Sequence, residues 1–281
     1  MRTAANPFTD PAQITGALYA SADRIAQRTG ALLRARVTGR HAGEVIAGLA
    51  HRAVGANDVL VADLGCGRGT TTRMLADRLP ATRVVAVDLS AALTATSRRR
   101  LAQSPRAGTV RADFHRLPFP DDSCGLVVAA FCLYHSPSPG SVITEITRCL
   151  RPGGTAIFAV KSADSYTELD QLVAVSGLDP AATSRRPSLY QAAHSGNITE
   201  LAAASLSVRL VTHETHRFIF PALANAAEYL ATSPKYDLPP ALAGNPAALA
   251  TALQQRVPDA PVTATSVVTY LVAHRPAEAL P

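Results

Sequence analysis

Residues 59–70 read VLVADLGCGRGT, an apolar run followed by three glycines at alternate positions. The apolar half has the composition of a strand that is buried on both faces of a sheet. Residues 71–79 then have the mixed polar and apolar pattern of an amphipathic helix. A strand, a glycine turn and a helix in this order open an α/β unit that binds nucleotides, because glycine adopts unusual backbone angles and lets a ligand approach the main chain closely.

The spacing of the glycines distinguishes between classes of nucleotide. The dinucleotide fingerprint G-x-G-x-x-G would need its third glycine at position 70, which is Thr70. A phosphate-binding loop would need Gly-Lys-Ser/Thr, and this segment contains no lysine. Asp63 instead lies two residues before Gly65, where its carboxylate would repel a pyrophosphate. The loop therefore favours a cationic ligand without phosphates, and it argues against an oxidoreductase that uses NAD.

Two further acids follow predicted strands at places that suit a nucleoside. The apolar stretch 83–90 contains Asp88 about 20 residues after the glycines, where an acid accepts hydrogen bonds from both hydroxyls of a ribose. Residues 109–114 end in Asp113 and Phe114, which suit the amino group and the ring face of a purine. Together with the glycine turn, they predict a nucleoside site at one edge of the sheet.

With Leu-Arg-Pro-Gly-Gly at residues 150–154, the four motifs resemble, in order, those of the class I S-adenosylmethionine-dependent methyltransferases. Within that family they are most similar to the small-molecule group, which includes the type 11 and quinone methyltransferases. The resemblance covers residues 57–161. Any one motif alone could be a turn or a helix cap, but the four in order indicate the family.

The resemblance implies an α/β, Rossmann-like fold with a seven-stranded sheet in the order 3-2-1-4-5-7-6, in which strand 7 is antiparallel. The implied cofactor is S-adenosyl-L-methionine, with S-adenosyl-L-homocysteine as product, lying over the carboxyl ends of strands 1 and 2. Tyr19 is an aromatic residue of the N-terminal segment. It is expected to contact the ligand, and the alternative is a position between a helix and the core. The expected cofactor contacts are Asp63, Gly65, Cys66, Gly67, Asp88, Leu89, Asp113, Phe114, Phe131 and Tyr19.

The rest of the chain is expected to surround this unit within one domain, residues 1–281. Residues 1–55 are predicted as a helical cover outside the sheet, a segment that packs across cofactor and substrate in similar methyltransferases. Residues 56–161 would form the cofactor-binding half, and residues 162–281 a substrate-side half with a lid insertion after strand 5. The alternating pattern over residues 263–274 predicts strand 7, with the character of an edge strand.

Methyl transfer needs alignment of an activated methyl carbon with its acceptor, and a base only where the acceptor carries a proton. His135 is the candidate catalytic base, because it follows the strand predicted over residues 124–130, at the edge where ligands bind in open α/β sheets. A histidine that only shapes the loop is the alternative. His213 and His216 are expected to face solvent from a strand rather than to bind a metal. The candidate substrate contacts are Tyr190, His194 and Tyr236.

The composition, 47% apolar and 17% charged, is that of an ordinary soluble globular protein. No run approaches the length of a membrane span, so no membrane partner is expected. The four cysteines lack metal-ligand spacing, which predicts no metal and a cytoplasmic location. The net charge of +6 comes almost wholly from arginine, since Lys161 and Lys235 are the only lysines. The arginines at 98–100 have no interleaved aromatic residues, which favours a solvated helix face over nucleic-acid binding.

The leading prediction is methyl transfer to an O, N or C atom of a small organic metabolite, with secondary metabolism as one setting. The Asn/Asp-Pro-Pro-Tyr/Phe stretch of methyltransferases that act on amino groups is absent, since residues 131–134 read FCLY. The chain also has no Pro-Cys pair of the kind that cytosine-C5 enzymes need. The alternatives are a non-catalytic module that binds cofactor or metabolite and, with less support, an RNA methyltransferase. The sequence does not predict the oligomeric state.

Overall fold

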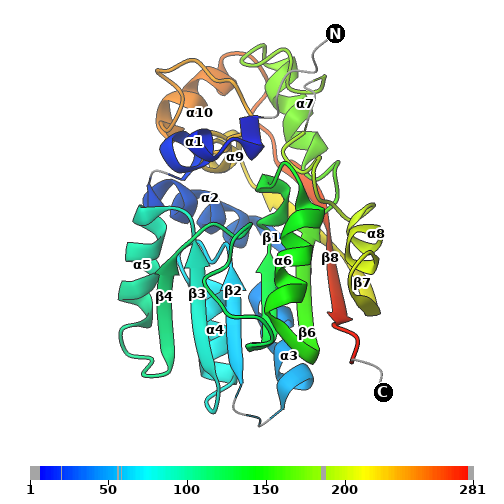
Figure 1. Ribbon diagram of the computed structural model, residues 1–281. Coiled ribbons are helices and arrows are strands. Elements are labelled where there is room, and N and C mark those ends of the chain that lie inside the picture. Colours follow the sequence, from blue (N-terminus) through cyan, green and yellow to red (C-terminus); the bar gives the residue numbers. More distant parts are fainter. Residues whose placement is uncertain (1–6, 20, 56, 58, 185–187, 278–281) are drawn as a thin grey trace.

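The computed structural model describes residues 7–19, 21–55, 57, 59–184 and 188–277. Its strands are Arg36–Thr38 (β1), Leu60–Leu64 (β2), Arg83–Asp88 (β3), Ala107–Arg111 (β4), Cys124–Ala130 (β5), Leu150–Lys161 (β6), Ser207–Phe220 (β7) and Val262–His274 (β8). They form one eight-stranded sheet in the order β1-β7-β8-β6-β5-β2-β3-β4 (Figure 1). The strands β2 to β6 pair in parallel, whereas β8 is antiparallel to both β6 and β7.

Strands β2 to β8 confirm the predicted sheet. Numbered along the chain as strands 1 to 7, they have the order 3-2-1-4-5-7-6, and the last of them, β8, is antiparallel. β2 lies between β3 and β5 and is buried along its length, which explains its apolar sequence. Because β2, β3 and β5 are parallel, the loops that follow them meet at one edge of the sheet.

Two details of the sheet differ from the prediction. β1 is an eighth strand inside the segment that was expected to be helical, and it pairs antiparallel with β7. Its residues Val37 and Thr38 are β-branched and favour an extended backbone. The second difference concerns β8, which lies between β6 and β7 and is therefore not an edge strand. Its second half, residues 268–273, is buried without interruption, as an interior strand requires.

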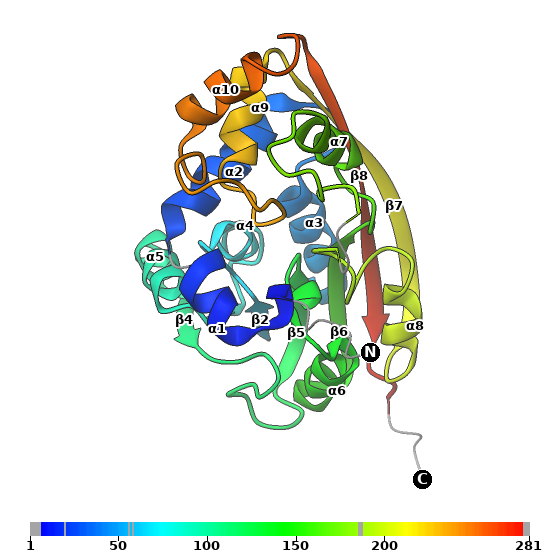
Figure 2. The same cartoon turned by 90° about the horizontal axis from the view of Figure 1, so that it is seen from above.

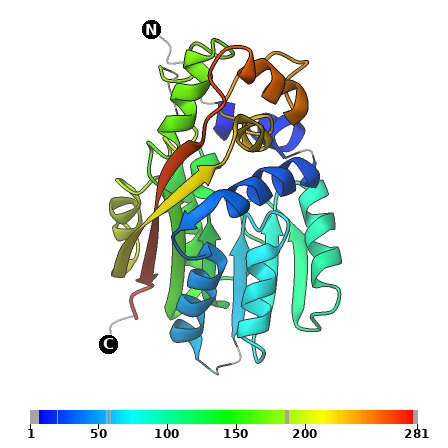
Figure 3. The same cartoon turned by 180° about the vertical axis from the view of Figure 1, so that it is seen from behind.

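The helices lie on both faces of the sheet and above its carboxyl edge. Their bounds are Pro11–Gln13 (α1), Ala22–Ala35 (α2), Ala42–Val54 (α3), Thr70–Arg78 (α4), Ala91–Leu101 (α5), Pro139–Cys149 (α6), Thr167–Val175 (α7), Ile198–Ala203 (α8), Leu223–Leu230 (α9) and Pro246–Gln254 (α10), with short turns η1 (Pro7–Thr9), η2 (Ile14–Leu18) and η3 (Leu133–His135). α3, α4 and α5 cover one face, where Figure 3 shows α3 and α4 side by side, and α6 and α8 cover the other.

The segment predicted as a cover divides into two parts. α3 packs on the sheet rather than over the ligand edge, because its apolar side buries Ile46 and Ala50 completely against the strands. The cover within the described residues therefore consists of η1, α1, η2 and α2. Asp10 caps α1, since its side chain accepts a hydrogen bond from the Ala12 N–H at 2.9 Å.

A cap of α1, η2, α2, α9 and α10 lies over the carboxyl edge of the sheet, as Figure 2 shows from above. The predicted insertion after strand 5 corresponds to α7 and α8, which follow β6, and a second insertion between β7 and β8 contains α9 and α10. Arg28 of α2 donates a hydrogen bond to the Thr232 carbonyl at 2.8 Å, and Arg34 pairs with Glu228 of α9, so both parts of the cap are joined. None of the helices that the structure describes is long and apolar enough to cross a membrane.

Candidate active site

A pocket of about 420 Å³ lies between the carboxyl edge of the sheet and the cap. One end is formed by the glycine loop after β2 and by Asp88 at the end of β3, and the other by tyrosines from the cap and from the loops after β5 and β6. Eight of the ten expected cofactor residues line it, namely Gly65, Cys66, Gly67, Asp88, Leu89, Phe114, Phe131 and Tyr19.

The glycine loop has the backbone conformation that its sequence predicted. Gly65 and Gly67 have φ angles of 59° and 57°, in the left-handed region that favours glycine. A Cβ atom at Gly65 would overlap the Cβ of Cys132, so the loop packs directly on the segment that follows β5. The Cys66 N–H donates to the Val87 carbonyl at 3.0 Å, which holds the loop against β3. The loop therefore presents its main chain to the pocket.

Asp88 lies beside this loop with both carboxylate oxygens oriented by the backbone. Oδ2 accepts a hydrogen bond from the Gly67 N–H and Oδ1 from the Ser90 N–H, each at 2.9 Å. Burial raises the pKa of Asp88, and the hydrogen bonds from the backbone oppose that change. Each carboxylate oxygen can accept a second hydrogen bond, so Asp88 retains acceptor capacity for ligand hydroxyls.

The two other predicted acids lie outside the pocket. Asp63 is 1% exposed and accepts a hydrogen bond from the Thr72 hydroxyl at 2.6 Å, so its side chain faces α4 and not the ligand. Burial is the main cause that raises the pKa of Asp63 to about 7. The hydrogen bond from Thr72 opposes this rise, and the charge of Asp88 adds to it. The Asp113 carboxylate pairs with the His115 ring at 2.8 Å instead of reaching the pocket. Both acids support the loops that shape the site.

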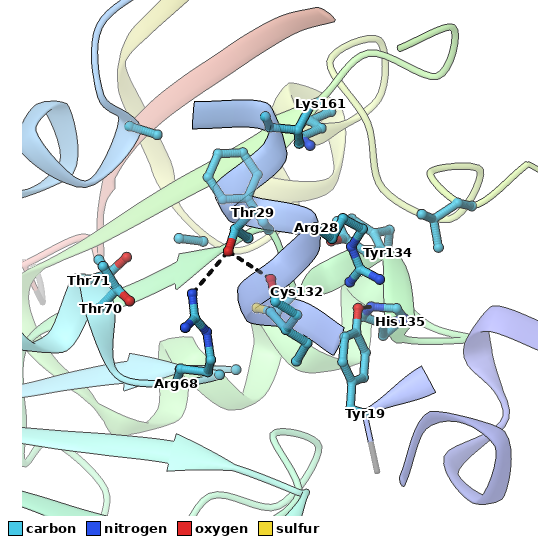
Figure 4. A pocket seen from close by; sticks show the side chains of 18 of the residues that line it. Tyr19, Arg28, Thr29, Arg68, Thr70, Thr71, Cys132, Tyr134, His135 and Lys161 are labelled. Carbon is cyan, nitrogen blue, oxygen red and sulfur yellow. Dashed lines mark hydrogen bonds between the residues drawn. The ribbon is translucent and has the colours of Figure 1, made fainter. Parts of the chain in front are cut away.

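His135 lies in the pocket beside the Tyr19 hydroxyl (Figure 4), and both of its ring nitrogens form hydrogen bonds. Nδ1 donates to the Phe8 carbonyl at 2.8 Å, and Nε2 then accepts a hydrogen bond from the Tyr19 hydroxyl at 2.6 Å. Burial is the main cause that lowers the pKa of His135 to about 4. His135 is therefore a neutral residue that joins the cover to the loop after β5, and a base role would require Tyr19 to leave Nε2.

The three candidate substrate residues are separated in the structure. Tyr190 lines the pocket, where its ring meets Tyr134 edge to face with centroids 5.2 Å apart. His194 lies outside it, and its Nδ1 accepts a hydrogen bond from the Gly196 N–H at 3.0 Å. The Tyr236 hydroxyl donates to Asp170 at 2.9 Å and lines a second cavity of about 240 Å³. Of the three, Tyr190 is placed to contact a substrate in the main pocket.

Lys161 is a pocket residue that the sequence analysis did not select. It ends β6, and its Nζ donates to the Tyr166 hydroxyl at 2.8 Å. The same atom lies 4.6 Å from the ring centre of Tyr166 and 5.7 Å from those of Phe131 and Tyr190. Burial, followed by the charge of Arg28, lowers the pKa of Lys161 to about 7. One signal was available in the sequence, because one of only two lysines directly follows a buried strand.

The two histidines of β7 do not both face solvent. His213 is exposed and its Nδ1 lies 2.8 Å from the Thr269 hydroxyl, as expected for the outer face. His216 is 5% exposed and lines the pocket, which corrects the prediction. The backbone at Gly39 covers it so closely that a Cβ there would lie 2.6 Å from the ring. Across the described residues, no three or more His, Cys, Asp or Glu side chains gather as a metal-binding group.

The family described as methyltransferase domain matches residues 62–158. This segment is a methyltransferase domain. It contains the glycine loop, Asp88 and Phe114, so the resemblance to the class I enzymes that these motifs predicted is confirmed. The match ends within β6 and leaves the whole cap outside it.

Individual relatives match part of the chain. It is 34% identical over 112 residues to the malonyl-[acyl-carrier protein] O-methyltransferase of Marinomonas sp. (strain MWYL1), covering 40% of this chain and 42% of the relative. It is 38% identical over 97 residues to the demethylmenaquinone methyltransferase of Clavibacter sepedonicus, covering 34% and 39%. The chain thus spans less than half of the length of these curated relatives.

A solved structure extends the likeness to the whole chain. The phosphoethanolamine N-methyltransferase 2 of Haemonchus contortus, in complex with S-adenosyl-L-methionine, has a TM-score of 0.58 at 16% identity. The match covers 97% of this chain and 61% of that one. At this identity the likeness shows the fold, so the cap belongs to the same fold as the methyltransferase domain.

We predict that Tyr19→Phe and His135→Asn act through their shared hydrogen bond. Each is expected to weaken the binding of S-adenosyl-L-homocysteine by about 1 kcal/mol, or roughly 5-fold, and the double variant by no more than either alone. Calorimetry measures the four affinities of this cycle. Tyr236→Phe, whose hydroxyl bonds Asp170 outside the pocket, is the matched control and should bind normally.

A catalytic base at position 135 would give a different result. His135→Asn alone would then lower turnover by about 10²–10⁴-fold, and a pH dependence near ~6.5 would disappear with it. With a pKa of about 4, His135 should instead contribute no change in activity as the pH falls from about 8 to about 5, so His135→Asn should keep the pH profile of the unsubstituted protein.

Proposed function

We propose that this protein transfers the methyl group of S-adenosyl-L-methionine to an O, N or C atom of a small organic molecule. The observation that carries the proposal is that the glycine loop and the tyrosine-lined end belong to one pocket. A cofactor beside Asp88 and an acceptor beside Tyr190 would share one space, as in-line displacement at a methyl carbon requires.

The chemistry of the glycine-loop end fits this cofactor. Gly65 and Gly67 have left-handed φ angles that let the main chain of the loop approach a ligand, and Asp88 has acceptor capacity for two ribose hydroxyls. Phe114, stacked on His115 with ring centres 4.8 Å apart, provides a flat apolar face for a purine. When bound, the cofactor supplies an activated methyl group on a positively charged sulfur. Loop, acid and aromatic face would hold its nucleoside part.

The contribution of the protein to the reaction is alignment and exclusion of water. Tyr19 and His135 join the cover to the loop after β5, so the cover closes the pocket beside the glycine loop. Alignment of two reactants in one site can lower a barrier by about 7–11 kcal/mol. A methyl-acceptor atom that is already unprotonated at neutral pH needs no base to remove a proton. This agrees with the structure, in which the ring nitrogens of His135 already form hydrogen bonds.

Binding and turnover measurements test this proposal in two steps. Calorimetry is expected to show binding of S-adenosyl-L-homocysteine with a dissociation constant in the micromolar range and no binding of NAD. Incubation with S-adenosyl-L-methionine and a panel of small metabolites is then expected to release S-adenosyl-L-homocysteine. Binding without release for every acceptor would favour the non-catalytic module instead. Binding of NAD in place of the homocysteine product would contradict the assignment of the cofactor site.

A small molecule is better supported as the substrate than a nucleic acid. Arg98 and Arg99 are exposed on α5, and Arg99 donates to the Thr96 hydroxyl of the same helix at 3.1 Å. Arg100 points away from the other two and donates to Thr70. This arrangement supports the solvated helix face that the sequence predicted, and the acceptor end of the pocket is lined by aromatic rings.

A further inference from the structure

Positively charged residues line the tyrosine-lined end of the pocket, and no carboxylate of the described residues lines that end, although Glu214 Oε1 lies 3.9 Å from His216 Nε2. Among the described residues that line the whole pocket, Asp88 is the one acid, and it belongs to the glycine-loop end. The basic residues that line it are Arg28, Arg36, Arg68 and Lys161. Lys161 and Arg28 lie at the end where the acceptor would bind, so the charges that an acceptor meets there are positive.

The two lysines of the chain have opposite surroundings. The side chain of Lys235 is 9% exposed, and its Nζ pairs with the Asp170 carboxylate at 2.8 Å. Lys161 contacts one tyrosine hydroxyl and three aromatic rings, and no carboxylate in the described part of the chain pairs with it. An ammonium removed from water is stable only with a counter-ion or strong acceptors. Lys161 therefore has the environment of a group whose counter-ion is a ligand.

Arg28 brings a second positive charge to the same place. Its Nη1 donates to the Thr232 carbonyl at 2.8 Å, and no carboxylate of the described residues forms an ion pair with it. Figure 4 shows its guanidinium directed toward Tyr134 and His135. Arg28 and Lys161 line the same pocket, so an anion bound there would be attracted by both positive charges.

The walls around these charges suit an apolar body. Tyr134, Tyr166, Tyr190 and Tyr229 all line the pocket and are buried. His216 lines it as well, is 5% exposed, and has an Nε2 atom without a hydrogen-bond partner among the described residues. A buried polar atom of this kind normally has a partner. The pocket thus provides charge and aromatic surface together with two polar atoms, His216 Nε2 and His41 Nδ1, that have no hydrogen-bond partner among the described residues.

Building on the proposed methyl transfer, we propose that the acceptor is an organic anion, with a carboxylate held by Lys161 and Arg28 and an apolar or aromatic body between the tyrosines. The carboxylate supplies the counter-ion that Lys161 lacks, and hydrogen bonds between charged partners are about twice as strong as neutral ones. His216 provides a further contact from β7. This arrangement would select acids over their uncharged amides.

The two lysines allow a direct test that does not depend on turnover. Protein labelled with ¹³C at lysine Cε, saturated with S-adenosyl-L-homocysteine, should show one side-chain signal for Lys161 and one for Lys235. The probes are benzoate, 3-phenylpropionate and octanoate, each beside its own amide. At least one acid is expected to shift the Lys161 signal and to move its titration to higher pH, because an anion favours the charged form. The Lys235 signal, already paired with Asp170, should not move.

Variants give the matching affinities. Lys161→Met and Arg28→Gln are each expected to weaken binding of the responding acid by about 10- to 100-fold, the scale of a charged hydrogen bond, while leaving the amide unchanged. The proposal would be overturned if the amides bound as well as the acids, or if none of the three acids shifted the Lys161 signal. Both results come from the unsubstituted protein, so they count even if both variants fail to fold. Cofactor binding and product release are measured without these probes, so failure of the methyl-transfer proposal is observed separately.

Discussion

Replacement of Asp88 by alanine is expected to weaken the binding of S-adenosyl-L-homocysteine by about 1.5–3 kcal/mol, which is roughly 10- to 150-fold in the dissociation constant. The Asp88 carboxylate lines the pocket and accepts hydrogen bonds from the Gly67 and Ser90 N–H groups. The alanine variant loses the acceptors for the ribose hydroxyls and leaves the Gly67 N–H without its partner. Calorimetric titration of the purified variant measures the loss.

Asp63 provides the matched control for this experiment. It is an acid of the same motif, but it lies outside the pocket and accepts a hydrogen bond from Thr72. Asp63→Asn keeps that acceptor and is expected to change the dissociation constant by less than about threefold. A large loss in Asp63→Asn would mean that this acid contacts the cofactor after all. An unchanged affinity of Asp88→Ala would mean that Asp88 only supports the loop.

The cofactor end of the pocket could be predicted because its residues follow neighbouring strands. Gly65 comes after β2, Asp88 ends β3 and Phe114 follows β4. In a parallel sheet the carboxyl ends of the strands meet at one edge, so residues that are distant in the sequence become neighbours in space. The direction of each side chain is less predictable. Asp63 and Asp113 stand at motif positions, yet their carboxylates form hydrogen bonds with Thr72 and His115 and do not line the pocket.

The acceptor end could not be predicted in the same way. Arg28 comes from α2, Lys161 from the end of β6, His216 from β7 and Tyr229 from α9, and only the folded cap brings them together. The spacing of His213 and His216 correctly placed them on opposite faces of a strand. It carried no information about Gly39 and the short β1, which cover the inner face and bury His216.

Substitution of Gly65 by alanine is expected to lower the free energy of unfolding by about 2–5 kcal/mol and to abolish measurable cofactor binding. The φ angle of 59° places this residue in the left-handed region, which costs a residue with a Cβ about 1–2 kcal/mol. The new methyl group would also overlap the Cβ of Cys132, and overpacking of this kind costs about 1–3 kcal/mol more. Because the loop must move to relieve the overlap, the surface that meets the cofactor changes with it.

Gly67→Ala separates the two causes, since Gly67 has nearly the same φ angle of 57° but no atom lies within 4 Å of a Cβ placed there. Without ligand, Gly67→Ala should therefore lose only the cost of the backbone strain, about 1–2 kcal/mol. Denaturant unfolding of both cofactor-free variants gives the comparison. If the two variants lose the same stability, then Cys132 moves aside and the backbone angle alone requires glycine at these positions. A larger loss in Gly65→Ala would instead show that close packing of the loop on the segment after β5 is what requires glycine at position 65.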